Sequence, residues 1–299
     1  MTIDVRDKLV DAHVHVHSPD TERYPLAPGF TKDDFWYRSM TPEDYARYGR
    51  RFGTVRANLV HPTWYGLDHS YIIDCIANAS GRYVGTDIVP AMSDVALPPP
   101  DRAMDALAER GIRAFRIRGG SARADFRMGA RWMDAPGYDA MFETAANYGL
   151  VLSFLVSPDD LPEIDRMCGR YPDTRVVIDH VAGIRVRDGR VNEKHVDVEM
   201  LRDLARHREI TVKLGPFHVL SEQPPPFLDL LPLLRRVIDA FGPDRCMWET
   251  DVGGPVPMSD PEAVYAATVD LILEQADFLS DVDREWVLFR TAERVLFGE

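Results

Sequence analysis

Short apolar runs alternate with stretches of helical spacing along the whole chain. The apolar runs are rich in β-branched residues and predict strands over 9–16, 55–62, 83–90, 112–118, 150–157, 175–182, 210–215 and 246–253. Between them, apolar positions three and four apart predict amphipathic helices, among them 101–111, 138–149, 161–171, 198–207 and 230–242. A last helical stretch covers 261–298. Alternation of this kind predicts parallel strands joined by crossover helices.

Polar side chains stand at or near the carboxyl ends of many predicted strands. In a closed barrel these ends converge on one mouth, whereas in an open sheet they spread along an edge. About eight strand and helix units in 299 residues therefore favour an α/β fold, a (β/α)8 TIM barrel, as a single domain over 1–299. The polar residues at the strand ends are His15, His61, Asp87, Arg118, His180 and Asp251.

Two long segments interrupt the alternation. Residues 18–49, rich in proline and aromatic side chains, follow the first predicted strand, and residues 215–227 follow the seventh. Long loops at the mouth of a barrel commonly serve as lids or pocket walls. We expect 18–49 to be an active-site lid or insertion.

Charge and cysteine content narrow the choice of partners. The net charge of −13 argues against nucleic acid or an anionic membrane, because both need clustered Lys and Arg, and it leaves a small-molecule substrate. Three widely spaced cysteines in no metal-binding pattern favour a reducing compartment. With no signal-peptide pattern at the start and no apolar run long enough to cross a bilayer, we expect a cytoplasmic location. Homo-oligomerisation stays open.

The first predicted strand carries alternating histidines. His13 and His15 in DAHVH (11–15) lie two residues apart, so their rings project from the same side of a strand. With His180 and Asp251 from two other strand ends, they offer four ligands for one divalent metal such as zinc. The same residues also work without metal, with Asp251 as general base for water and His180 as donor to a substrate carbonyl. Both versions describe hydrolysis.

The order of motifs resembles the amidohydrolase superfamily, in its amidohydrolase-2 branch, which contains 2-pyrone-4,6-dicarboxylate lactonase and sugar lactonases. LVDAHVHV (9–16) is similar to the first-strand signature of the branch, and GIRAFRIRG (111–119) to its fourth-strand segment. VVIDHVAG (176–183), VKLG (212–215) and FGPDRCMWETD (241–251) match in the same order. The resemblance implies a distorted (β/α)8 barrel that hydrolyses or decarboxylates a small substrate at its strand carboxyl ends.

The resemblance also implies roles for individual residues. His13 and His15 take the first-strand roles, His180 the sixth-strand role, Asp251 that of general base, and Arg116 that of the substrate-facing arginine. Metal-dependent members carry a histidine on the fifth strand, or a bridging lysine or glutamate on the fourth. Neither LVLSFLVS nor RAFRIR has such a residue. This favours the lactonase-like side of the branch, with no required cofactor or with one divalent metal ion, zinc or manganese.

Several positions depart from the family pattern or stand near the expected mouth. Glu249 replaces a glycine two residues before Asp251, and a second carboxylate there would raise the pKa of its neighbour or add a ligand. His61 stands where the branch has a glutamine, and His218 near the position of an arginine. We expect substrate contacts from Arg116 and Arg118, which would clamp an anion, and from His61, His218, Glu249, Trp36 and Tyr65.

The predicted function is hydrolysis of a lactone or similar cyclic ester of a small, acidic or aromatic-derived metabolite by activated water. The first alternative is a metal-dependent decarboxylase of the same branch, which would hold one Zn²⁺ or Mn²⁺ on the same four residues and act on an aromatic or unsaturated carboxylic acid. A phosphoesterase or nuclease of related barrel type is disfavoured, since those carry further ligands. A barrel kept as a binding scaffold is the non-enzymatic alternative.

Overall fold

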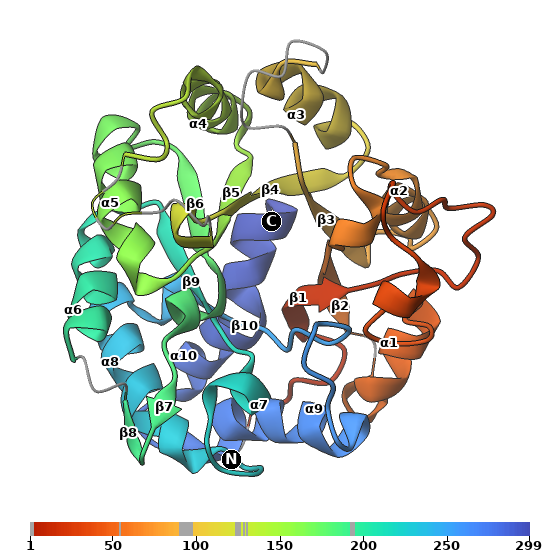
Figure 1. The fold of residues 1–299 in the computed structure, drawn as a ribbon. Coiled ribbons are helices and arrows are strands. Elements are labelled where there is room, and N and C mark those ends of the chain that lie inside the picture. Colours follow the sequence, from red (N-terminus) through yellow and green to blue (C-terminus); the bar gives the residue numbers. More distant parts are fainter. Residues whose placement is uncertain are drawn as a thin grey trace.

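Eight parallel strands form one sheet that curls into a barrel, with helices around it (Figure 1). The computed structural model describes residues 3–53, 55–89, 98–122, 127, 129, 131–191 and 195–299. The predicted (β/α)8 barrel is confirmed. In order around the sheet, the strands are β1 (Val10–His15), β2 (Arg56–Val60), β3 (Tyr83–Asp87), β4 (Ile112–Arg118), β5 (Val151–Leu155), β6 (Arg175–Ile178), β9 (Ile210–Leu214) and β10 (Cys246–Trp248).

The helices cover the outside of the barrel with their apolar faces. In α8, the buried positions Leu233, Leu234, Val237, Ile238 and Phe241 follow the three- and four-residue spacing of one helix face. Burying one such side chain stabilises the fold by about 1.5–3 kcal/mol. The helices are α1 (Pro42–Tyr48), α2 (Ser70–Ala77), α3 (Pro100–Ala108), α4 (Pro136–Tyr148), α5 (Leu161–Arg170), α6 (His195–Asp203), α7 (Phe217–Leu220), α8 (Leu231–Phe241), α9 (Pro261–Asp270) and α10 (Asp281–Glu285).

Two strands end earlier than the sequence pattern predicts. The sixth strand stops at residue 178 instead of 182, because His180, Val181 and Ala182 have φ values of 56°, 52° and 55°. The eighth stops at 248 instead of 253, and Asp251 has a φ of 54°. Left-handed backbone costs residues with a side chain roughly 1–2 kcal/mol each. These turns lie at the carboxyl ends of the strands, so the strain is held where His180 and Asp251 are placed.

The barrel closes between β1 and the segment that follows β10. His15 N donates to Val252 O (2.8 Å), and Asp251 N donates to His13 O (3.0 Å). Deeper in the same seam, the Asp11 carboxylate accepts hydrogen bonds from Thr250 N and Thr250 Oγ1. This closure sets Asp251 directly beside the two histidines of the first strand.

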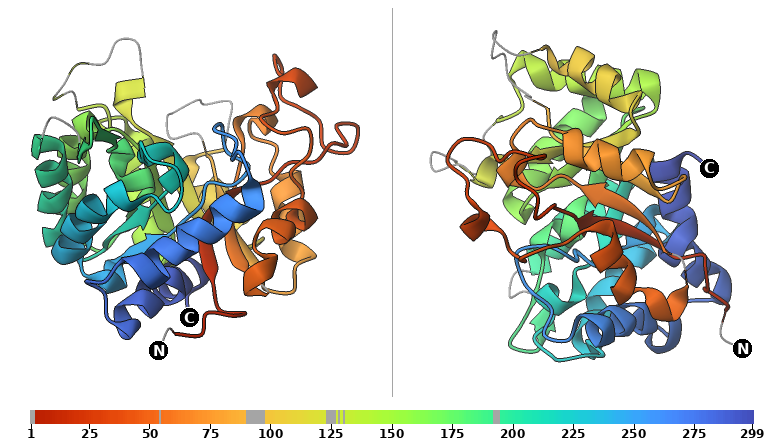
Figure 2. Two further views of the ribbon diagram at one scale, coloured as in Figure 1. Left: turned by 90° about the horizontal axis from the view of Figure 1, so that it is seen from below. Right: turned by 90° about the vertical axis from the view of Figure 1, so that its right-hand side faces the viewer.

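The insertion after β1 projects at the end of the barrel opposite the N terminus (Figure 2). Its residues 18–49 include α1, and its start is fixed by a bridge between His17 and Met40. His17 Nε2 also donates to Tyr37 O (2.7 Å). The second insertion contains α7, and a small hairpin of β7 (Val186–Arg187) and β8 (Arg190–Val191) follows β6. Among the described residues, no helix is long and apolar enough to cross a bilayer.

Candidate active site

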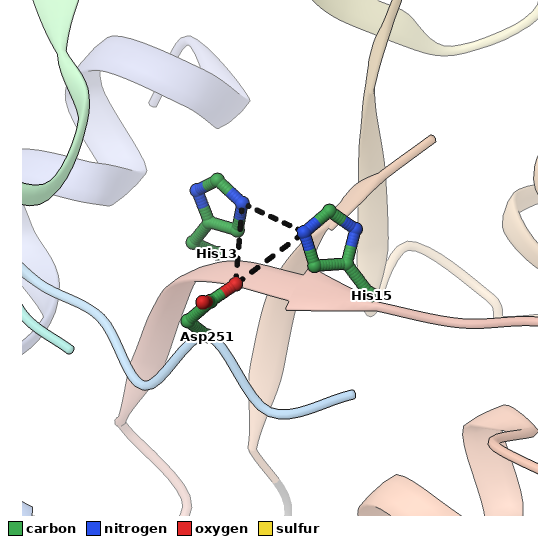
Figure 3. Close-up of side chains that lie close together, drawn as sticks. All are labelled: His13, His15 and Asp251. Carbon is green, nitrogen blue, oxygen red and sulfur yellow. Dashed lines mark hydrogen bonds and ion pairs between the residues drawn. The ribbon is translucent and has the colours of Figure 1, made fainter. Parts of the chain in front are cut away.

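His13, His15 and Asp251 meet at the carboxyl end of the first strand (Figure 3). The two Nε2 atoms are 3.3 Å apart. Asp251 Oδ1 lies 3.3 Å from His15 Nε2 and 3.7 Å from His13 Nε2. All three side chains are buried. The alternate spacing along β1 thus brings both rings to one side, as the sequence predicts.

The neighbours of each ring decide where its protons sit. A carbonyl oxygen only accepts, so His15 Nδ1 donates to Val60 O (2.9 Å). Lys213 Nζ lies 3.2 Å from His13 Nδ1 and donates to it, which leaves the His13 proton on Nε2, facing His15. Burial, aided by the Lys213 charge, holds the pKa of His13 well below its usual range. His13 is therefore neutral.

The same three residues have the donor set of a metal site. Asp251 Oδ1 has no aligned hydrogen-bond donor among the described residues, and it lies 3.3 Å from His15 Nε2. A buried carboxylate oxygen beside two imidazole nitrogens offers the ligand atoms that a divalent cation such as zinc takes. His13 Nε2 would join as a ligand once its proton moved to Nδ1, where Glu249 Oε2 is 3.3 Å away. The residues present fit one divalent metal ion.

His180 is held by Glu249, which lies behind it. Glu249 Oε1 lies 2.6 Å from His180 Nδ1 and accepts a further hydrogen bond from the His180 backbone N–H (3.2 Å). Burial alone would lower the pKa of His180, but the Glu249 and Asp251 carboxylates outweigh it and raise that pKa above its usual value. For Asp251, burial would raise the pKa, but His15, His180 and Arg116 hold it below its usual value. The site thus favours a protonated His180 and an ionised Asp251.

Two charged residues of this site were missed by the sequence argument. Lys213 Nζ lies 2.8 Å from Asp179 Oδ1, and Asp179 also contacts Arg116 Nε (3.5 Å) and accepts from Ser153 Oγ (2.8 Å). Lys213 and Arg116 outweigh burial and hold the pKa of Asp179 well below its usual range. A lone lysine in the apolar run VKLG and an aspartate inside VVIDHVAG were the available signals, because charged residues are seldom buried without a partner.

A cavity of about 280 Å³ opens beside these residues. Arg116 is largely buried there through its contact with Asp179, whereas Arg118 and Arg185 form no ion pair within the described part of the chain. Two unpaired guanidinium groups at the wall of a cavity are suited to an anionic ligand group. The residues lining the cavity include His15, His180, Asp251, Arg116, Arg118, Arg185 and Trp36.

Four residues expected to contact substrate do not line this cavity. Glu249 is fully buried behind His180. Tyr65 Oη accepts from Ser18 N (3.0 Å), and His218 Nε2 donates to Val256 O (3.0 Å), so both hold loops at the mouth. His61 faces Asp87 at the ends of β2 and β3. Each of the four has a polar partner within the protein.

Comparisons with known proteins agree with this geometry. A family model of amidohydrolases, Amidohydro_2, matches residues 10–298. An L-fucono-1,5-lactonase of Burkholderia ambifaria is 27% identical over 255 residues, 81% of this chain and 79% of the relative. A 4-sulfomuconolactone hydrolase of Hydrogenophaga intermedia is 28% identical over 250 residues, 81% of this chain and 73% of the relative.

Solved structures share the fold over nearly the whole chain. A probable 2-pyrone-4,6-dicarboxylic acid hydrolase of Acinetobacter baumannii, with citric acid bound, superposes with a TM-score of 0.72 at 16% identity, covering 98% of this chain and all of that one. An amidohydrolase of Burkholderia multivorans with bound zinc reaches 0.70 at 19% identity, covering 97% of this chain and 99% of that one. With the family model spanning the barrel from its first strand to its last helical segment, the chain belongs to the amidohydrolase family and is a hydrolase of that family.

Proposed function

We propose that this amidohydrolase opens a lactone or similar cyclic ester of a small, acidic metabolite with an activated water molecule. The main support is that one cavity is lined by both an ionised Asp251 and a His180 that Glu249 keeps protonated. A base and an acid whose pKa values are pushed apart by their surroundings suit acyl transfer to water. The two relatives described above are named as a lactonase and a lactone hydrolase, which supports the same reaction class.

The reaction uses the chain's own groups in a defined order. Asp251 accepts a proton as water attacks the lactone carbonyl carbon, and a new carbon–oxygen bond forms. His180, held through Nδ1 by Glu249, donates a hydrogen bond from Nε2 to the carbonyl oxygen as negative charge develops there, and it keeps its proton. The ring carbon–oxygen bond then breaks, and the proton taken by Asp251 passes to the leaving alkoxide. The product is a hydroxy acid.

The walls of the cavity suit the orientation of such a substrate. Arg116, Arg118 and Arg185 would hold an acidic group of the substrate or the carboxylate of the product. Trp36 belongs to the insertion and lines the cavity, where it would cover the substrate. This supports the role of residues 18–49 as a lid. Where a divalent metal is bound, Zn²⁺ or Mn²⁺, His13, His15 and Asp251 would hold it, and it would supply Lewis-acid activation of water and carbonyl.

Asp251→Asn tests the proposal. The amide keeps the shape of the side chain but is no base, so we expect kcat for lactone opening to fall about 10²- to 10⁴-fold. A panel of sugar lactones and carboxylated lactones would be assayed before and after chelation, with metal content measured by elemental analysis. Asp277→Asn, at an exposed position, is the matched control.

Two results would overturn the assignment. One is lactone hydrolysis that persists unchanged in pure, folded Asp251→Asn. The other is a wild-type protein that leaves every lactone intact but releases CO₂ from aromatic or unsaturated carboxylic acids. The second result would instead establish the decarboxylase alternative.

A further inference from the structure

A second cluster of imidazole and carboxylate groups lies at the ends of β2 and β3. His61 follows β2, Asp87 ends β3, and His69 is the residue before α2. His69 Nδ1 lies 2.7 Å and His61 Nδ1 3.3 Å from the same oxygen, Asp87 Oδ1. None of the three lines the active-site cavity.

The hydrogen bonds around the cluster orient the His61 ring toward Asp87. His61 Nε2 donates to Gly66 O (2.9 Å), so the neutral ring turns a lone pair on Nδ1 toward Asp87. Neither His61 Nδ1 nor His69 Nδ1 has an aligned hydrogen-bond partner among the described residues. Two imidazole nitrogens thus converge on one buried carboxylate oxygen without an aligned hydrogen bond between them.

We propose that His61, His69 and Asp87 form a binding site for a divalent transition metal ion of the zinc type, distinct from the catalytic residues. Two imidazole nitrogens and one carboxylate oxygen are the ligands that zinc takes, with the fourth position left to water. Gly66 O on the far nitrogen of His61 and Ile88 N on Asp87 Oδ1 (2.8 Å) are the supporting contacts expected behind metal ligands.

The spacing of the ligand atoms agrees with this assignment. Two ligands of a tetrahedral zinc, each about 2.0–2.1 Å from the ion, lie roughly 3.3 Å apart. The contact between His61 and Asp87 has that length. His69, which is partly exposed and starts a helix, would withdraw from Asp87 by roughly 0.6 Å to admit the ion.

The ion would have a structural effect on the mouth of the barrel. His61 and His69 bracket the loop over 62–68, which carries Trp64. The Trp64 ring packs on that of Trp36, with centroids 4.9 Å apart, and Trp36 lines the active-site cavity. A metal tied to both ends of this loop would therefore fix the wall on which Trp36 rests.

Zinc titration of metal-free protein tests the site apart from catalysis. A background variant, His15→Asn with Asp251→Asn, removes two of the three ligands of the central site, and its zinc binding is measured by calorimetry with Zn²⁺ alone. We expect about one equivalent of zinc in this background and none after His69→Gln is added. His207→Asn, which removes a histidine paired with Asp165 elsewhere, is the matched control and should keep the equivalent.

Two outcomes would overturn the site: a folded background variant that binds no zinc, or zinc binding that survives His69→Gln unchanged. Circular dichroism of each variant shows whether the fold is kept. If His69→Gln fails to fold, a second measurement takes its place: whether zinc protects His69 of the wild-type protein from a histidine-selective reagent. The same protection is expected in the background variant. Unprotected His69 at saturating zinc would refute the proposal. Lactone turnover is not the readout, so these results are independent of the proposed reaction.

Discussion

At the scale of single residues, the site depends on charges that are paired inside the barrel. Behind His13, the Asp179 carboxylate pairs with two cations, Lys213 and Arg116. Removing one partner of a buried ion pair is destabilising by about 3–5 kcal/mol, because the other charge stays buried alone. Glu249 is in the same position relative to His180, and it therefore affects both the orientation and the proton of that ring.

Glu249→Gln should shift the pH dependence of turnover. Glu249 helps to raise the pKa of His180, so the protonated donor persists above the ordinary pKa of 6.5. The neutral amide removes that support, and the alkaline limb of kcat/KM should move to lower pH. Profiles of kcat/KM against pH measure the shift. Glu163→Gln, at a buried carboxylate paired with Arg166 on α5, should leave the limb in place; an unmoved limb in Glu249→Gln would refute the role of Glu249.

The sequence predicts which site residues lie together where the spacing along a strand determines which way their side chains point. His13 and His15 alternate on one strand, and His180 and Asp251 follow strands whose carboxyl ends share one mouth. The position of Glu249 behind His180 could not be predicted. A regular eighth strand would aim it to the same side as Asp251, but the strand ends at Trp248 and the backbone then turns to a positive φ at Asp251.

At the scale of elements, strand β4 separates its arginines by alternation. Arg116 and Arg118 lie two residues apart and line the cavity, whereas Arg113 lies near Gly298 at the other end of the strand. One strand therefore offers both a test residue and its control.

Arg118→Gln should weaken the binding of anionic substrates selectively. A hydrogen bond to a charged group contributes about 1.5–3 kcal/mol, so KM for a carboxylated lactone should rise roughly 10- to 100-fold. KM for a neutral sugar lactone should change little, and Arg113→Gln should change neither. Steady-state kinetics on the two substrates decide this. Equal losses on both substrates would show that Arg118 supports the pocket wall instead of binding an anion.

Element boundaries were predictable where composition changes sharply and uncertain where several short segments follow one another. The fourth strand has the predicted bounds, 112–118. The stretch 261–298 is not one helix, because Ser280 caps a new helix, α10, through hydrogen bonds with Asp283. Helical segments at Leu271–Gln275, Trp286–Arg290 and Glu293–Phe297 complete it. The capping box at Ser280 marks the start of the new helix, and the spacing of apolar residues alone does not reveal this boundary.

At the scale of the whole molecule, the barrel is closed by a seam of few backbone bonds. The parallel bridge between Val14 and Val252 is supplemented by Asp11, whose buried carboxylate accepts from Thr250 N (3.0 Å) and Thr250 Oγ1 (2.6 Å). Burial raises the pKa of Asp11 to about 7, and the Thr250 hydrogen bonds oppose the rise. Relative to its unfolded value of 3.8, this raised pKa means that stability from Asp11 is lost as pH rises through about 7.

Thr250→Val should destabilise the fold, and more so at alkaline pH. The hydroxyl stabilises the ionised form of Asp11, so the loss is largest above pH 7, where the folded carboxylate is ionised, and smaller at pH 5, where it binds a proton. We expect a cost of about 1–3 kcal/mol at pH 8, measured by urea unfolding at both pH values. Thr211→Val, the same change at a buried position of β9, should cost equally at both. If Thr250→Val lowers the free energy of unfolding equally at both pH values, the seam is held by backbone hydrogen bonds and packing, and the ionisation of Asp11 does not contribute.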